Sequence, residues 1–226
     1  MTILQILAQY WPLLLQGFET TLILAVTGFI IGAVTGLPLS LVETYAPREM
    51  RWLVTSYVEL IRGTPMLVQL FLIYYALPQV GVTLNAMTAA IFGLGMNSGA
   101  YQAEYFRGAI NSVQSGQMEA AESIGLSKAQ SILEVILAQA LRFVIPAWTN
   151  EVVYLIQYSS IVYLITVIEL TGVGTIIGTQ TYEYVSTYII IALIYVVTTL
   201  AIVKASHVVE YKTAIPGLLT RNQRFQ

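Results

Sequence analysis

QMEAAESIGLS, at residues 117–127, is a short, polar, alanine-rich stretch in a chain that is otherwise strongly apolar. Its first residues are mostly good helix formers, and Gly125 interrupts the pattern. Ser127 fits the N-cap of a second helix, so the stretch predicts one short helix, a turn and the start of another. By itself the pattern is also typical of a solvated surface helix, so its role depends on the segments around it.

The composition of the whole chain is typical of a membrane protein. The chain has 226 residues, of which 57% are hydrophobic and 10% charged, and its mean hydropathy is +0.73. It contains no cysteine, which excludes disulfides, thiol catalysis and cysteine metal sites. The net charge of −2 gives no indication of a nucleic-acid-binding surface.

Five stretches are long and apolar enough to cross about 30 Å of hydrocarbon. They are residues 18–41, 65–80, 86–109, 145–168 and 188–209. We therefore expect an all-α integral membrane protein with about five transmembrane helices, which form a single domain over residues 1–226.

Lysine and arginine occur beside only one set of the links between these stretches. They are Arg48, Arg51, Arg62, Arg107, Lys128, Arg142, Lys204, Lys212, Arg221 and Arg224. The links at 78–85 and 169–187 contain none. Cytoplasmic loops carry an excess of basic residues, so we expect the stretches at 43–63 and 111–142 and the C-terminus in the cytoplasm, and the N-terminus outside. An odd number of spans also places the two termini on opposite sides of the membrane. We therefore expect a multi-pass protein of the cytoplasmic membrane.

The central polar stretch also has a specific spacing. Glu119-Ala120-Ala121 is followed after three residues by Gly125, and nine residues later by Val135-Ile136-Leu137. This spacing resembles the EAA motif in the permease subunits of type I ATP-binding-cassette (ABC) importers, where the loop forms a coupling helix that docks into a groove on the cytoplasmic ATPase subunit. The resemblance implies that the 111–142 loop contacts an ATPase through Glu119, Ala120, Ala121, Glu122 and Gly125. Ala138 stands where the family usually has proline.

Four further stretches are similar to the polar amino-acid branch of these importers, in the same order and at compatible spacing over residues 62–160. They are Arg62-Gly63-Thr64-Pro65 with Met66-Leu67-Val68-Gln69, Asn97-Ser98-Gly99-Ala100-Tyr101 with Glu104 and residues 107–110, Ser115-Gly116-Gln117, and Ile145-Pro146-Ala147 with Asn150-Glu151. The resemblance implies a permease that imports a polar amino acid by ATP-driven alternating access, with substrate delivered by an extracytoplasmic binding protein. Five helices are too few to enclose a transport cavity, which implies a homodimer or a pair with a similar subunit.

The chain has no glycine-rich phosphate loop ending in Gly-Lys-Ser/Thr. We therefore expect ATP and Mg²⁺ to be bound by the partner ATPase pair, and this chain to be a transport subunit rather than an enzyme, with no cofactor of its own. His207 is isolated from other potential ligands, so the sequence predicts no metal site.

Polar groups within a span are costly, at about 2.5–3.5 kcal/mol for a central charge, and usually face the bundle interior or a wet cavity. The third and fourth spans hold nearly all of this polarity. We predict substrate contacts from Asn97, Ser98, Tyr101, Glu151, Tyr154, Gln157, Tyr158 and Ser159. Asn97 and Ser98 have interhelical hydrogen bonding as an alternative role. Glu151 has no basic neighbour within a helical turn and would receive a substrate ammonium, unless it is protonated, buried or directed outward.

A second set of residues near the inner end of the bundle is predicted to be structural or to take part in gating. The set comprises Arg62, Gly63, Thr64, Pro65, Glu104 and Arg107. Thr64 fits a helix N-cap with Pro65 at the first helical position. Glu104 and Arg107 lie at i and i+3, which favours an ion pair over a ligand contact. Arg62 fits either an interfacial anchor or a gating residue.

The substrate is less well defined than the family. The amino-acid branch usually has a Lys-Asp-Thr-Ser-like run where this chain reads Gln157-Tyr158-Ser159-Ser160. Glu151 and the absence of outer basic residues favour a cationic or neutral amino acid over an acidic one. The alternatives are a permease for another small polar solute or an ion-coupled secondary transporter, although no internal repeat is visible. A membrane enzyme lacks support, since the chain has no metal-ligand cluster or paired intramembrane carboxylates.

Overall fold

In the computed structural model, residues 2–213 are described, and they form helices connected by short loops, with no strand among them. Arg221 and Arg224, part of the predicted cytoplasmic charge, lie outside the described residues. The α-helices are α1 Ile3–Tyr45, α2 Arg48–Arg62, α3 Met66–Phe71, α4 Ala86–Asn111, α5 Gly116–Ser123, α6 Lys128–Gln130, α7 Leu137–Phe143, α8 Ile145–Ser159, α9 Leu170–Thr181 and α10 Tyr184–Thr213. Two π-helical segments, Leu72–Ala76 and Ser131–Ile136, and two 3₁₀ segments, Leu77–Val80 and Ser160–Ile165, extend these helices. The predicted all-α membrane fold is confirmed.

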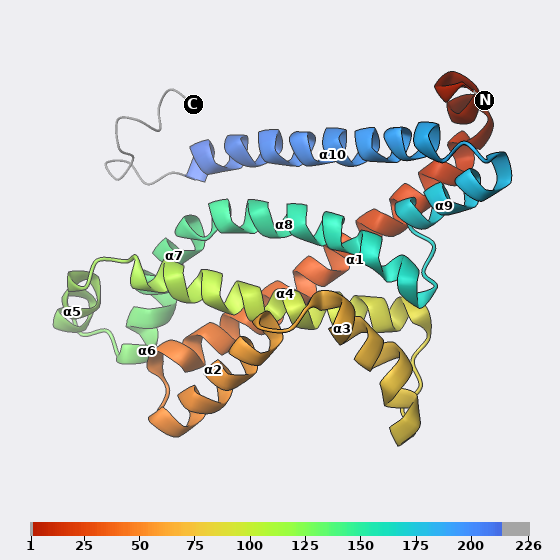
Figure 1. Cartoon of the computed structure of the whole chain (residues 1–226). Helices are drawn as coiled ribbons and strands as arrows, with labels where there is room; N and C mark the ends of the chain where they lie inside the picture. Colours follow the sequence, from red (N-terminus) through yellow and green to blue (C-terminus); the bar gives the residue numbers. More distant parts are fainter. Residues whose placement is uncertain (1, 214–226) are drawn as a thin grey trace.

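Two of the described helices are long and apolar enough to cross a membrane alone. These are α1 and α10, and α1, with 43 residues, is much longer than the stretch predicted at 18–41. At about 1.5 Å per residue it extends over roughly 65 Å, about twice the hydrocarbon thickness. Figure 1 shows α1 running obliquely across the other helices. The predicted fifth stretch at 188–209 lies within α10.

The second and fourth predicted stretches belong to bent helix pairs. The 65–80 stretch is preceded by α2, and the two helices meet at 101°, so residues 48–80 together have the length and composition of a broken span or a re-entrant loop. The polar segment at 48–62 is a helix rather than a loop. The segment Lys128–Phe143 meets Ile145–Ile165 at 55°. The predicted fourth stretch at 145–168 thus ends as a 3₁₀ segment at Ile165, and α9 occupies the link predicted at 169–187.

The third predicted stretch, at 86–109, corresponds to α4. This helix lies inside the bundle, where it contacts α1, α2, α3 and α8. It is 26 residues long but carries buried Asn97, Ser98 and Gln102. Because neighbouring helices cover it, α4 can hold polar side chains that an exposed span could not.

Glycines allow α1 and α4 to approach closely. A Cβ atom added at Gly28 would lie 3.2 Å from Cβ of Leu94, and one added at Gly36 would lie 2.9 Å from the carbonyl oxygen of Gly99. A Cβ at Gly95 would meet the side chain of Ile31. Small residues four apart are the usual basis of close helix packing in membranes, where backbone contact replaces the hydrophobic effect.

The ends of the helices agree with the predicted topology. Figure 1 shows α5 and the last turns of α10 at one end of the molecule. The first turns of α1, the loop before α4 and the turn between α9 and α10 lie at the opposite end. The basic residues therefore gather towards the end that carries α5, as expected for the cytoplasmic side.

Candidate functional site

The junction between α2 and α3 is fixed by one buried side chain. Nε2 of Gln69 lies 2.7 Å from the carbonyl oxygen of Ile61, 3.0 Å from that of Thr64 and 2.8 Å from Oγ1 of Thr64. Gln69 is 4% exposed. These contacts let the backbone stop being helical at Gly63 and restart at Met66 without leaving the junction carbonyls unsatisfied.

Thr64 has a different local role from the one predicted. The helix after the junction begins at Met66, with Pro65 preceding it, and no side chain caps this end. The Thr64 hydroxyl instead donates to the carbonyl oxygen of Leu60 at 3.0 Å and accepts the Gln69 amide. The predicted cap was wrong because the hydroxyl is used by the end of α2 and by Gln69.

Gln69 also contacts α4. Nδ2 of Asn97 donates to Oε1 of Gln69 at 3.0 Å, and Asn97 is 5% exposed. The interhelical hydrogen bond expected as an alternative role for Asn97 is therefore present. It uses the amino group of Asn97 and leaves Oδ1 for another partner.

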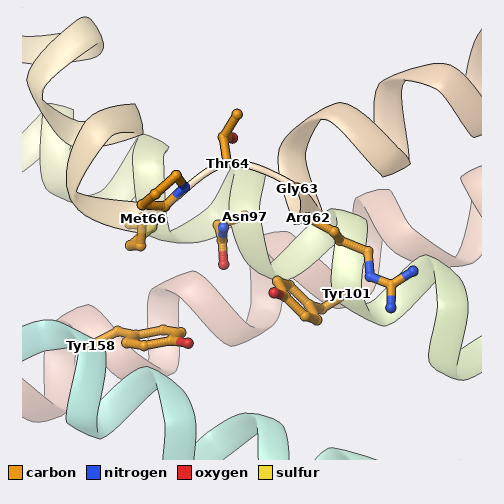
Figure 2. A pocket seen from close by; sticks show the side chains of 8 residues that line it. Arg62, Gly63, Thr64, Met66, Asn97, Tyr101 and Tyr158 are labelled. Atoms are coloured by element: carbon orange, nitrogen blue, oxygen red, sulfur yellow. The ribbon is translucent and has the colours of Figure 1, made fainter.

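A pocket of about 220 Å³ lies beside this junction. Its lining comes from the junction itself and from α4 and α8. The lining residues are Arg62, Gly63, Thr64, Pro65, Met66, Asn97, Tyr101 and Tyr158. Figure 2 shows the Asn97 side chain and the rings of Tyr101 and Tyr158 bordering the same space. The structure thus brings together three of the predicted substrate residues and four of the predicted gating residues.

Arg62 forms one boundary of the pocket. Its guanidinium carbon lies 5.3 Å from the centre of the Tyr101 ring, within the range of a cation–π contact. Its Nη1 lies 3.4 Å from Oε2 of Glu104. Figure 2 shows the guanidinium directed away from Asn97 and Tyr158. Arg62 therefore joins the junction to α4 rather than only anchoring it at the membrane surface.

Arg107 holds Glu104 in place. Its Nε and Nη2 atoms donate to the two oxygens of Glu104 at 2.8 and 2.6 Å. This is the predicted i, i+3 ion pair, here in the bidentate form that arginine favours. Glu104 is 21% exposed and is occupied by two guanidinium groups, so it does not line the pocket.

Ser98 and Glu151 lie behind the pocket lining. The Ser98 hydroxyl donates to Oε1 of Glu151 at 2.6 Å, and the two residues are 0% and 4% exposed. Nε2 of Gln102 reaches both Ser98 Oγ and the carbonyl oxygen of Phe29, at 3.0 Å each, which joins α1 to this pair. Within the described residues Glu151 contacts protein rather than pocket space, which matches the buried alternative for this residue.

The other predicted residues of α8 are distributed around the helix. Tyr154 is half exposed and stacks on Tyr158 with ring centres 6.2 Å apart. Gln157 is exposed. Ser159 is buried, and its hydroxyl donates to the carbonyl oxygen of Ile156 at 2.7 Å. Of the predicted α8 contacts, only Tyr158 lines the pocket.

The central polar stretch forms the predicted pair of short helices. Gly125 follows α5 with φ of +93°, a left-handed conformation that glycine adopts without a steric penalty. The Ser127 hydroxyl accepts from the Gln130 N–H at 3.4 Å and the Gln130 side chain accepts from the Ser127 N–H at 2.9 Å, which makes a capping box. The predicted N-cap is confirmed.

Some side chains of α5 pack against the rest of the molecule, and others are exposed. Ala121 is 4% exposed, and Met118 packs against the cluster that includes Ile136 and Phe106. Glu119, Ala120, Glu122 and Gly125 are exposed. Ile124, next to the turn, is 80% exposed, and the predicted coupling residues did not include it. The helix therefore presents acids, one small side chain and one large apolar side chain on the cytoplasmic end.

Gln69 is the pocket-supporting residue that the site prediction omitted. It is the one side-chain amide in the otherwise apolar stretch at 65–77. Because a polar side chain within a span is costly, this amide could have been recognised from the sequence as a residue with a structural or functional role. No group of three or more potential metal ligands occurs in the described residues.

Comparisons with known proteins identify the family of this chain. Residues 28–210 match the family model described as "Binding-protein-dependent transport system inner membrane component". The chain is 40% identical over 185 residues to a probable amino-acid ABC transporter permease of Bacillus subtilis, with 82% of each chain covered. It is 37% identical over 202 residues to an L-cystine transport system permease of the same organism, with 89% of this chain and 86% of the relative covered.

A solved structure shows the same fold. The crystal structure of an amino acid ABC transporter with histidines contains a chain that is 39% identical to this one, with a TM-score of 0.87. The match covers 94% of this chain and 99% of that chain. These relatives are transport components of ABC systems rather than enzymes. This protein therefore belongs to the family of binding-protein-dependent transport system inner membrane components, as an ABC transporter permease of the amino-acid type.

Proposed function

We propose that this chain carries a polar amino acid with a neutral or cationic side chain through the cytoplasmic membrane. The observation that supports the proposal is the pocket at the α2–α3 junction, which faces α4 and α8 in a chain whose relatives transport amino acids. Its volume of about 220 Å³ lies below the roughly 300–1,000 Å³ typical of pockets for drug-sized ligands, so it suits a small solute.

The proposed mechanism is alternating access driven by a separate pair of ATPase subunits. ATP and Mg²⁺ bind to those subunits, and their closure moves α5 and the helices attached to it. The exposed residues Glu119, Ala120, Glu122 and Ile124 form the surface that docks on the ATPase. Small side chains permit close approach, and a large apolar side chain can fill a pocket on the partner.

Two further partners belong to this proposal. A second permease, either a copy of this chain or a similar subunit, completes the transport cavity. An extracytoplasmic binding protein delivers the amino acid at the end of the molecule that carries the α9–α10 turn. Membrane lipid surrounds the exposed apolar faces of α1 and α10.

The test is ATP-dependent uptake into liposomes that contain the permease, its ATPase and its binding protein. Labelled arginine, histidine, glutamine, methionine and glutamate are compared, with an ATPase variant that binds but does not hydrolyse ATP as the control. ATP-dependent accumulation of one of them is expected. Uptake of none, in a complex that stays assembled and hydrolyses ATP, would overturn the amino-acid assignment.

A further inference from the structure

The described pocket contains no carboxylate. Its eight lining residues include one charged side chain, Arg62, and that guanidinium is already held by Glu104 and the Tyr101 ring. The acid behind the lining, Glu151, is 4% exposed and accepts the Ser98 hydroxyl. A cationic side chain in the pocket would therefore have no anion to contact among the lining residues. An acidic side chain would meet only Arg62, whose guanidinium lies over the Tyr101 ring and is directed away from Asn97 and Tyr158 (Figure 2).

An uncompensated charge is expensive at this depth. A charged side chain inside a membrane helix is unfavourable, and so is an unpaired charge in a protein interior. The walls formed by Tyr101, Tyr158 and Met66 instead offer two aromatic rings and a thioether, which suit uncharged groups.

The orientation of Asn97 adds a specific contact. Nε2 of Gln69 faces three junction oxygens, so Oε1 of Gln69 must face α4, where it accepts Nδ2 of Asn97 at 3.0 Å. The Asn97 amide is thereby fixed with Oδ1 on the other side. Figure 2 shows this oxygen directed into the space beside Tyr158. An oxygen acceptor in this position suits an N–H donor such as an α-ammonium group.

We propose that the pocket selects an amino acid with a neutral side chain, binding its α-ammonium at Oδ1 of Asn97 and its side chain between Tyr101 and Tyr158, with Gln69 as the positioning residue for Asn97. This inference rests on the proposed function and narrows its substrate class. Every amino acid supplies the ammonium, so discrimination comes from the side chain. A cationic side chain is rejected because no carboxylate lines the pocket, and an acidic one because the Arg62 guanidinium is directed away from Asn97 and Tyr158.

The experiment measures binding to the permease–ATPase complex in the absence of the binding protein, so that the selectivity of the binding protein does not enter. Labelled methionine, glutamine, arginine and glutamate are each titrated by equilibrium dialysis. Methionine or glutamine is expected to bind with a Kd at least about tenfold below those of arginine and glutamate, a difference of about 1.4 kcal/mol. Equal or tighter binding of arginine or glutamate overturns the neutral class and leaves the importer assignment intact. Binding of none, when uptake succeeds, overturns the pocket.

Variants test the individual residues. Asn97→Leu removes the acceptor and is expected to raise the Kd of the neutral amino acid roughly ten- to hundredfold, the usual effect of losing a hydrogen bond to a charged group. Asn150→Leu, at an exposed amide on α8, is the matched control. Tyr158→Asp adds a carboxylate to the lining and is expected to lower the Kd of arginine at least tenfold relative to that of glutamine. If Tyr158→Asp leaves the ratio of the arginine Kd to the glutamine Kd unchanged, selection by charge is wrong. This result does not depend on whether the Asn97→Leu variant folds.

The positioning role of Gln69 has its own readout. If Gln69 acts through Asn97, Gln69→Leu raises the Kd in the wild-type background but adds no further loss to Asn97→Leu. Additive losses would show that Gln69 supports the pocket independently of Asn97, and the positioning role would be wrong.

Discussion

The Ser98 hydroxyl donates a 2.6 Å hydrogen bond to Oε1 of Glu151, and both side chains are buried between α4 and α8. The phenol of Tyr105 lies beside the same carboxylate. A buried acid needs such donors, because leaving it unsatisfied costs more than a neutral group would. The pair therefore connects two helices whose other faces form the pocket.

Replacing Ser98 with alanine is expected to destabilise the permease by about 1.5–3 kcal/mol, the range for a lost hydrogen bond to a charged group. The measurement is the thermal midpoint of the purified permease–ATPase complex. Ser160→Ala is the control, since the Ser160 hydroxyl donates only to the Gln157 carbonyl oxygen of its own helix. Equal midpoints for the two variants would contradict the role of the Ser98–Glu151 bond.

Replacing Glu151 with glutamine is expected to leave the Kd of the transported amino acid within about tenfold of the wild-type value. Glutamine keeps an acceptor for Ser98, and Glu151 does not line the pocket. Equilibrium dialysis measures the change, with Asn97→Leu as the variant that should weaken binding. A larger loss for Glu151→Gln than for Asn97→Leu would place the substrate ammonium at Glu151.

Alanine at Gly36 is expected to destabilise the permease by about 1–3 kcal/mol, the usual effect of overpacking. The new Cβ would lie 2.8 Å from Cβ of Gln102 and 2.9 Å from the backbone nitrogen of Ala103, neither of which can move freely. Gly108→Ala on α4 is the matched control, because nothing lies within 4 Å of a Cβ there. Alanine favours helices by about 1 kcal/mol over glycine, so the control should be neutral or stabilising. Similar midpoints for both variants would contradict the close packing of α1 and α4.

Aspartate at Ile124 is expected to abolish or strongly weaken binding of the ATPase subunit without lowering the stability of the permease. Ile124 is 80% exposed, so its replacement removes no core contact. Co-purification with a tagged ATPase measures the effect. Tyr182→Asp is the control, since Tyr182 is 86% exposed and belongs to the turn between α9 and α10, a turn that lies at the opposite end of the molecule (Figure 1). Unchanged co-purification of the Ile124 variant would remove this residue from the docking surface.

Alanine at Glu169 is expected to destabilise the permease by about 1–3 kcal/mol. The Glu169 carboxylate accepts the backbone N–H groups of Thr171 and Gly172 at 2.8 Å each, which caps α9, and accepts the Tyr195 hydroxyl at 2.9 Å. Of these contacts, Tyr195→Phe removes only the hydrogen bond from the Tyr195 hydroxyl to Glu169, so it should destabilise the permease less than Glu169→Ala does. Thermal midpoints rank the two variants, and a larger effect for Tyr195→Phe would show that the cap contributes little.

The apolar stretches predicted most of the membrane fold, because length and hydropathy report directly on what can cross a bilayer. They did not predict the bend at residues 63–65. The Arg62 charge and the polar residues before it favoured a cytoplasmic loop, whereas contacts with α1 and α4 hold residues 48–62 as a helix of the bundle. Tertiary contacts of this kind have no local signal in the sequence.

The structure divides the residues predicted to contact substrate into those that line the pocket and those whose polar groups bond to other protein groups. Asn97, Tyr101 and Tyr158 reach the pocket, whereas Ser98, Glu151 and Ser159 satisfy one another or the backbone. Spacing along a helix identifies a polar face, but the neighbouring helix decides whether that face meets a partner or a cavity. Gln69 illustrates the same limit, since its three junction contacts depend on the bend.

The glycine contacts between α1 and α4 restrict how the transporter can move. Where two backbones touch with no side chains between them, sliding by even one residue would bring a Cβ atom into a space that only glycine leaves free. We therefore expect α1 and α4 to travel as one rigid body during the transport cycle.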